Sequence, residues 1–327
     1  RNTRKTTCCF GGGGAGGFLP LKGKSFTLAE VLITLGIIGI VAAITLPALI
    51  NKIDDRQYRV ARQKMHYTMR EGLRSIAAEG LTGDYVDAKD FVENELKKRV
   101  KIIKTCENDN LRACGIETGA GKIFNILDVP ITMPRQIKDL YISYSNGNGL
   151  NGEDKSYGFI LSNGYSVNLF YNPKCQNLKY EKDLPYISYW QYITDVVCVN
   201  LIYDMNGLSK PNKVGKDIGF VTMVSPGIST QVAAPDVFLV LNRQGATFTA
   251  ANKYCTNIGK GYTMPTLEEL IAAAYNGDMV LGKTAGGGSF WASNHDFGNQ
   301  ALMLIFYYGY FGYWNKSTHG DIMCVRR

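Results

Sequence analysis

An uncharged run of 20 residues, 31–50, constrains this chain more than any other feature. At about 1.5 Å per residue, a helix of this length crosses a hydrocarbon core of roughly 30 Å. A cleaved secretory signal is the alternative, but such signals have apolar cores of about 7–15 residues followed by a small-residue cleavage site. The run therefore predicts one transmembrane helix near the N-terminus.

Basic charge is concentrated before this run. The chain has 36 Lys and Arg against 28 Asp and Glu, a net charge of +8. Residues 1–25 contain basic side chains and no acidic one, so the remainder is close to balanced and gives little support for a nucleic-acid partner. Under the positive-inside rule, the N-terminus stays in the cytoplasm and the part after the run is exported.

Glu30 borders the apolar run, where an unpaired carboxylate is costly and needs a cationic partner. The basic leader, the sequence Phe-Thr-Leu-Ala-Glu and the apolar helix after it resemble type IV prepilins and pseudopilins. The resemblance implies that a prepilin peptidase cuts between Ser25 and Phe26, and that the new amine is methylated. It also implies that Glu30 meets the Phe26 amine of a neighbouring pilin subunit. Ser25 departs from the family, which most often has Gly there.

Residues 51–78 predict a continuation of the helix as an amphipathic one. Gly72 is their only Gly or Pro, and apolar residues recur every three or four positions. The apolar residues are Ile53, Val60, Ala61, Met65, Met69, Leu73, Ile76 and Ala77. We therefore predict a pilin-like helix over 26–78, after a cleaved leader over 1–25, with a membrane half at 31–50 and an upper half packed on a globular head.

Residues 79–232 have the short alternating apolar segments and Asn-Gly turns of an antiparallel sheet. The loop over residues 204–217 resembles one that is common in pseudopilin heads. In it Asp204, Asn206 and Asp217 offer the oxygen ligands that Ca²⁺ prefers, although the spacing and closing Glu of an EF-hand are absent. Ca²⁺ is thus a candidate cofactor, and an Asx-turn loop without metal is the alternative.

Six of the eight cysteines follow the apolar run: Cys106, Cys114, Cys175, Cys198, Cys255 and Cys324. No C-x-x-C pair occurs and the three histidines are scattered, so zinc-ligand spacing is missing. An even count suits disulfides in an oxidising compartment, although six cysteines allow fifteen pairings. In the predicted head, Cys106 with Cys114 would close a small loop and Cys175 with Cys198 a larger one.

The composition changes at residues 232–235, a plausible linker to a last domain over 233–327. A helix pattern bearing Cys255, a Pro-Thr-Leu-Glu-Glu-Leu segment, a Phe-Trp-Ala-Ser strand and a final Cys-Val-Arg resemble the bacterial C-type-lectin-like fold. The resemblance implies a Cys255–Cys324 disulfide. The predicted fold class is α+β: a long N-terminal helix on an antiparallel pilin sheet, then a lectin-like α+β domain.

Relatives of that fold bind ligands or generate formylglycine. The domain has neither a copper-binding cysteine pair nor the motifs of calcium-dependent sugar sites, and no nucleophile with a base or metal can be assembled, so we predict a binding protein and no enzyme. Tyr, Asn, His and Trp crowd its last third, as in antibody paratopes. The predicted ligand-binding residues are Asn294, His295, Asp296, Asn299, Ile305, Tyr307, Tyr308, Tyr310, Phe311, Tyr313 and Asn315.

These patterns predict a minor type IV pilin-like subunit that displays an adhesin domain, with an extracellular protein or glycan as ligand. The alternative is a structural minor pseudopilin of a type II secretion system. The expected location is the inner membrane with the C-terminal part exported, then a surface pilus or a periplasmic pseudopilus. The residue profile of the predicted surface also resembles the variable stretches that diversity-generating retroelements mutate at exposed positions.

Overall fold

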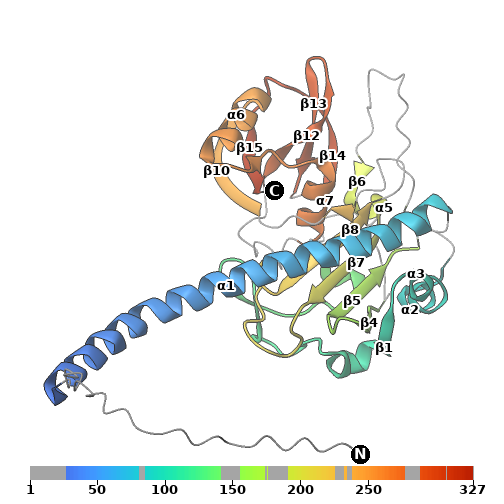
Figure 1. The fold of residues 1–327 in the computed structure, drawn as a ribbon. Coiled ribbons are helices and arrows are strands. Elements are labelled where there is room, and N and C mark those ends of the chain that lie inside the picture. The colour runs from blue at the N-terminus through green and yellow to red at the C-terminus, as the bar shows by residue number, and fades with distance from the viewer. Residues whose placement is uncertain are drawn as a thin grey trace, which may run out of the picture. The chain divides into compact units, whose positions relative to one another are not determined.

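The structure is a computed structural model (Figure 1), and it describes residues 27–80, 85–140, 155–173, 175, 191–224, 232–233, 238–276, 288–306 and 308–326. The contacts between residues divide the chain into two units, Arg1–Ile53 and Asp54–Arg327. The chain is a mixed α and β protein, and the sheets described below lie in the second unit.

The long N-terminal helix is present as α1, Leu28–Ala78. Its window Leu28–Thr45 has a mean hydropathy of 2.3 with no residue buried, so it is long and apolar enough to cross a membrane. In the second unit α1 is amphipathic, and its most buried side chains are Met65, Met69, Leu73 and Ile76. Val60 departs from the predicted stripe, because its side chain is 60% exposed.

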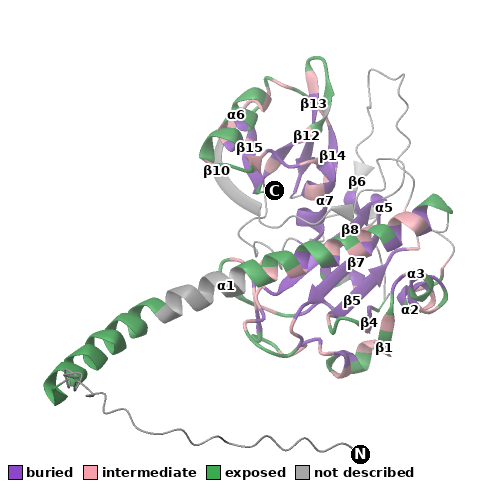
Figure 2. Ribbon diagram, in the orientation of Figure 1, coloured by how far each residue is buried: buried purple, intermediate pink, exposed green. Residues whose placement is uncertain are grey.

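A six-stranded antiparallel sheet has the order β1-β4-β5-β7-β8-β9. Its strands are β1 (Ile102–Cys106), β4 (Tyr157–Leu161), β5 (Ser166–Tyr171), β7 (Val197–Asp204), β8 (Ile218–Val224) and β9 (Val232–Ala233). One face packs against α1, in a core cluster that includes Leu73, Leu169 and Leu201. The three central strands are buried along their whole length (Figure 2), which requires a cover on the other face as well.

Short elements surround this sheet. They are α2 (Ala88–Phe91), a π-helical turn (Val92–Leu96), α3 (Lys97–Arg99), a 3₁₀ helix (Asn108–Cys114), β2 (Ile123–Phe124), β3 (Pro130–Ile131), α4 (Ile137–Leu140) and α5 (Ile193–Val196). The side chain of Glu95 in the π-helical turn is 2% exposed and forms an ion pair with Arg99. Arg99 also donates a 3.0 Å hydrogen bond to Ser75 of α1, which fastens this segment to the long helix.

The second sheet has seven strands, in the order β10-β15-β12-β13-β14-β6, with β11 beside β15. Its strands are β10 (Phe238–Ala246), β15 (Gly320–Arg326), β12 (Ser289–Phe297), β13 (Gln300–Ile305), β14 (Tyr310–Asn315), β6 (Gln191–Tyr192) and β11 (Tyr262–Thr263). All its described ladders are antiparallel except the short parallel contact between β12 and β15. Strand β6 comes from the region predicted to form the first sheet, yet Tyr192 pairs with Tyr310 at the edge of the second.

Two helices accompany the second sheet, as the sequence predicts. They are α6 (Phe248–Ile258) and α7 (Leu267–Tyr275). Helix α7 begins at Leu267 because Thr266 and Glu269 form a capping box, in which each side chain accepts a hydrogen bond from the other residue's backbone N–H.

Helix α7 belongs to a core that both sheets share. One hydrophobic cluster contains Leu270 of α7, Ile202 and Phe220 of the first sheet, and Leu302 and Leu304 of the second. A buried polar contact joins the same elements. Asn200 of β7 donates a 2.9 Å hydrogen bond to Asn276 at the end of α7 and accepts one of 2.6 Å from Thr222 of β8. Helix α7 is therefore part of the cover that buries the second face of the first sheet.

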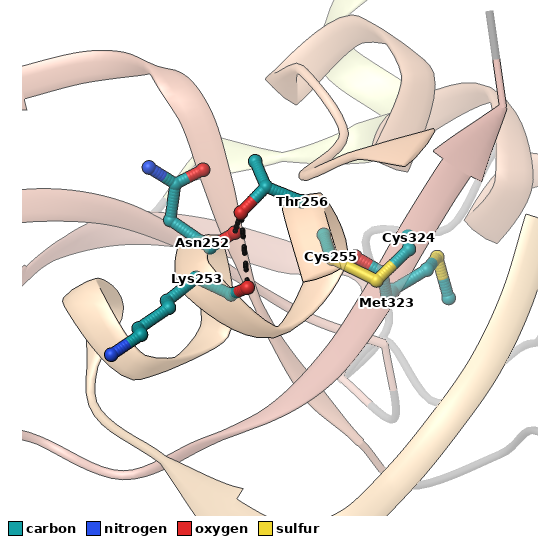
Figure 3. Close-up of a disulfide and its surroundings, with 6 residues drawn as sticks. All are labelled: Asn252, Lys253, Cys255, Thr256, Met323 and Cys324. Atoms are coloured by element: carbon teal, nitrogen blue, oxygen red, sulfur yellow. Dashed lines mark hydrogen bonds between the residues drawn. A yellow bond between two sulfur atoms is a disulfide. The ribbon is translucent and has the colours of Figure 1, made fainter. Parts of the chain in front are cut away.

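Within the described residues, three disulfides are present: Cys106–Cys114, Cys175–Cys198 and Cys255–Cys324. They are the three pairs expected from the sequence and its resemblances. The last joins α6 to β15 across 69 residues of chain (Figure 3), and both of its sulfur-bearing residues are fully buried. Disulfides of this kind are typical of proteins in an oxidising compartment.

Candidate functional site

The N-terminal end of α1 places Glu30 in a capping box. Glu30 Oε2 accepts hydrogen bonds from Thr27 N (2.9 Å) and Thr27 Oγ1 (3.0 Å), and Thr27 Oγ1 accepts one from Glu30 N (3.2 Å). The carboxylate thus has hydrogen-bond donors within its own helix, where the sequence predicted only a need for an external cation. Ser25 and Phe26, on either side of the predicted cleavage site, lie outside the described residues.

In the second sheet, two turns meet at one end: the turn between β12 and β13 and the turn between β14 and β15 (Figure 1). Lys316 N donates a 2.8 Å hydrogen bond to the Asn299 carbonyl, and the Lys316 ammonium forms an ion pair with Asp296. The rings of Phe297 and Tyr313 meet edge to face at 5.3 Å. We call Asp296, Phe297, Asn299, Tyr313, Asn315 and Lys316 the hairpin-tip surface.

This surface combines an exposed aromatic ring with fixed polar groups. Phe297 is 57% exposed, although a ring of that size is normally buried. Tyr313 is half-buried, and burial raises the pKa of its hydroxyl to about 12. Asn315 Oδ1 accepts hydrogen bonds from Ser317 N (3.0 Å) and Ser317 Oγ (2.8 Å), which holds the second turn rigid. The surface is preorganised for contact, and such rigidity lowers the entropy lost on binding.

The structure does not bring the eleven predicted ligand-binding residues onto one surface. Asp296, Asn299, Tyr313 and Asn315 lie at the hairpin tip, whereas Tyr308 and Tyr310 lie at the opposite end of β13 and β14. The ladder from Gln300–Asn315 to Ile305–Tyr310 spans six residues, or roughly 17 Å. The rings of Tyr308 and Tyr310 stack on each other at 5.6 Å, beside the β6 edge.

Two predicted ligand-binding residues are corrected by the structure. Ile305 and Phe311 are 9% and 4% exposed and belong to two different core clusters, so neither faces outward. Strict alternation along β13 would place Met303 and Ile305 on the face opposite Leu302 and Leu304, towards solvent. Both faces of β13 are in fact covered, and Met303 is also buried. Buried positions cannot be varied freely, which removes Ile305 and Phe311 from any diversified surface.

Asn294 has a structural role. Its Oδ1 accepts a 2.9 Å hydrogen bond from Leu267 N at the start of α7, and its Nδ2 donates one of 2.9 Å to Glu268. The side chain of His295 and all of Tyr307 lie outside the described residues. Phe297 and Lys316 are not predicted from the sequence, although the sequence Asp-Phe-Gly-Asn is typical of a tight turn, and Gly298 has the positive φ of 56° that such a turn requires.

The loop between β7 and β8 brings Asp204, Asn206 and Asp217 together. Asp204 is 3% exposed; its Oδ1 accepts a 3.0 Å hydrogen bond from Asn206 N. Asp217 is fully buried and accepts hydrogen bonds from the backbone N–H groups of Asn212 (2.8 Å) and Lys213 (2.7 Å). Burial, with a smaller contribution from the Asp217 charge, raises the pKa of Asp204 to about 8.

Two oxygens of this loop lack a hydrogen-bond partner. Within the described residues, Asp204 Oδ2 and Asn206 Oδ1 are buried without a hydrogen-bond partner. Buried polar atoms are nearly always hydrogen-bonded, and a buried carboxylate is especially costly to leave unpaired. Across the described part of the chain, no group of three or more His, Cys, Asp or Glu side chains is arranged to hold a metal, so any ligand set here must include the Asn206 amide or backbone carbonyls.

Comparisons of the chain with protein-family models, with curated proteins and with solved structures gave no match.

Proposed function

We propose that the chain is a pilin-like subunit that presents its hairpin-tip surface to a ligand outside the cell. The apolar half of α1 anchors the chain in the inner membrane. A prepilin peptidase cleaves the chain before Phe26, and the chain then assembles with other pilin subunits. The apolar helix, the position of Glu30 at its start and the three disulfides support this function. The ligand is an extracellular protein or glycan, and the chain binds without catalysis and without nucleic acid.

One observation carries the ligand-binding part of the proposal: Phe297 is held at the hairpin tip with 57% of its surface exposed. Aromatic residues in such a position contribute large contact areas at low entropic cost. Truncating a well-packed interface aromatic costs about 2–4 kcal/mol of binding free energy, or roughly 30- to 1000-fold in affinity.

We expect Phe297→Ala to leave the chain displayed on the cell surface and to lower its ligand binding at least 30-fold, while the loss of the edge-to-face contact with Tyr313 lowers stability by no more than about 1.5 kcal/mol. Surface labelling and adhesion of cells that carry the variant measure the two effects. Ile258→Ala is the matched control, since Ile258 is 40% exposed on α6. It should leave adhesion unchanged.

The same assay tests the pilin part through Glu30. Glu30→Gln keeps an oxygen that can accept the Thr27 hydrogen bonds but removes the charge, whereas Glu30→Ala removes both. If the charge pairs with a neighbour's N-terminal amine, both variants insert and are cleaved but fail to assemble. Assembly of Glu30→Gln together with failure of Glu30→Ala would mean that only the helix cap matters, and would contradict the proposed pairing.

Normal adhesion by Phe297→Ala would favour the structural pseudopilin, in which the C-terminal part has no ligand of its own. Mass spectrometry provides a separate check on processing. An intact leader on the surface-exposed chain would overturn the pilin proposal.

We further propose that Asp204 and Asn206 hold Ca²⁺ in the exported protein. The ion would neutralise the buried carboxylate and give both orphaned oxygens a partner. The raised pKa means that the folded protein binds the Asp204 proton more tightly than the unfolded chain does. Without metal, the contribution of Asp204 to the free energy of unfolding is therefore greatest at low pH and falls as the pH rises towards 8. Ca²⁺ competes with the proton for the carboxylate, so its effect should grow over the same range.

We expect 10 mM Ca²⁺ to raise the free energy of unfolding by about 1–3 kcal/mol at pH 9, given the affinities of extracellular calcium sites, and by less at pH 6. Thermal unfolding in Ca²⁺, Mg²⁺ and EDTA measures this. Asp204→Asn should abolish both the calcium effect and the pH dependence due to Asp204. Equal melting temperatures in Ca²⁺ and EDTA at pH 9 would contradict the site.

A further inference from the structure

The turn between β2 and β3 exposes two apolar side chains on either side of an acid. Leu127 and Val129 are 57% and 48% exposed, and the Asp128 side chain is 73% exposed. We call these three residues the 127–129 turn. Single exposed apolar residues are common, but here two of them stand on either side of an exposed acid.

The 127–129 turn is rigid. Buried Asn125 accepts 2.9 Å hydrogen bonds at its Oδ1 from both Leu127 N and Val129 N. Asp128 has a positive φ of 62°, and its carboxylate forms a 2.6 Å ion pair with Lys213. These hydrogen bonds hold the backbone of the turn in one arrangement, which lowers the entropy that a docking contact must offset.

A groove of about 400 Å³ lies between α1 and the turn that joins β4 to β5. It is lined by Arg56, Gln57, Val60, Ala61, Lys64 and Tyr165. Val60 is the residue that departs from the buried stripe of α1, and here it forms an exposed part of the groove. Arg56 and Lys64 add positive charge, and within the described residues neither forms an ion pair with a carboxylate. The groove thus offers an apolar floor with cations beside it.

The two features are separate surfaces of one chain, since no residue of the 127–129 turn lines the groove. The 127–129 turn is fixed to the loop that carries Lys213, and that loop contacts α1 at Tyr58 and Arg62. A chain with two separate and complementary surfaces can join copies head to tail, and head-to-tail contacts generate helical filaments when they do not close.

We propose that the 127–129 turn of one molecule docks in the groove of a second copy of this chain. Leu127 and Val129 would cover Val60 and Tyr165, and Asp128 would lie near Arg56 and Lys64. Apolar surface meets apolar surface, and Asp128, which already pairs with Lys213, would meet two further cations; this complementarity favours the occupant over an uncharged one. This contact rests on the proposed function because it assumes that copies of the chain assemble. It does not involve the hairpin-tip surface.

Cross-linking of the full-length chain in membranes tests the contact, in a host that makes no other pilin. Two differently tagged versions are co-expressed in a Cys8→Ser, Cys9→Ser background, one with Val129→Cys and the other with Val60→Cys. We expect a mixed disulfide-linked dimer. Val86→Cys serves as the matched control for Val60→Cys, because Val86 is 79% exposed and lies outside the groove. It should give at least tenfold less dimer with Val129→Cys.

Charge reversal separates docking from random collision. Lys64→Glu in the groove copy, or Asp128→Lys in the turn copy, should each lower the cross-linking yield about fivefold, as expected for one surface ion pair. The two changes together, in opposite copies, should restore it. Unchanged melting temperatures would show that the variants fold.

Equal dimer yields with Val60→Cys and Val86→Cys, or a combined charge reversal that fails to restore the yield, would overturn the proposal. So would a cross-link that forms only when another pilin or an anionic lipid is supplied, because the groove would then belong to that partner. Adhesion through Phe297 is measured separately, so failure here would leave the proposed function intact.

Discussion

Replacing Cys255 and Cys324 together with alanine is expected to lower the free energy of unfolding by about 4 kcal/mol. The disulfide closes a loop across a sequence separation of 69, and the restraint that it places on the unfolded chain grows with loop length. Both residues are fully buried, so alanine is preferable to serine, whose hydroxyl would need a hydrogen-bond partner in the core. Denaturant unfolding in detergent, followed by far-UV circular dichroism, measures the loss.

The matched control is the Cys106→Ala, Cys114→Ala double variant, whose loop spans a sequence separation of only 8. The same dependence on loop length predicts that this double variant lowers the free energy of unfolding by about 2.5 kcal/mol. Equal losses in the two double variants would show that loop length does not set the stabilisation. Labelling of Cys255 or Cys324 by a thiol reagent in the native exported protein would show that the bridge is not formed there.

Leu270→Ala is expected to destabilise both sheets at once, by about 2–5 kcal/mol. Leu270 is fully buried on α7, in the cluster that holds side chains of both sheets. The cavity that the substitution creates should therefore weaken the cover of the first sheet and the packing of the second. Hydrogen exchange measures this, since amides of β7 and of β13 should exchange faster by similar factors.

Leu208→Ala provides the comparison, because Leu208 is 41% exposed in the loop between β7 and β8. It should change stability by less than about 0.5 kcal/mol. If Leu270→Ala speeds hydrogen exchange only in β12–β14, the two sheets unfold independently. That result would contradict a shared core.

The sequence predicts the parts of this fold that depend on local patterns. The uncharged run and the stripe of α1 and the alternating strands of the first sheet follow from periodicity rules. The three disulfides follow from the order of cysteines within each region together with the two resemblances.

The parts that the sequence does not predict depend on contacts between distant segments. Strand β6 has two residues, too few for an alternating pattern, so nothing local indicates that it pairs with β14. Ile305 is buried because a second cluster covers the face of β13 that alternation assigns to solvent. Phe297 is exposed against its normal preference, and only its position in a turn could have drawn attention to it.

The shared core limits how such a chain can be recombined during evolution. A binding domain on a flexible tether can be exchanged by joining genes at the tether, since neither partner depends on the other's surface. Here α7 covers part of the first sheet, and Asn200 of that sheet is hydrogen-bonded to Asn276 at the end of α7. A replacement for the C-terminal part must bring a helix that fits Ile202 and Phe220, so sequence change should accumulate at the hairpin tip while α7 and its footprint on the first sheet are inherited as a pair.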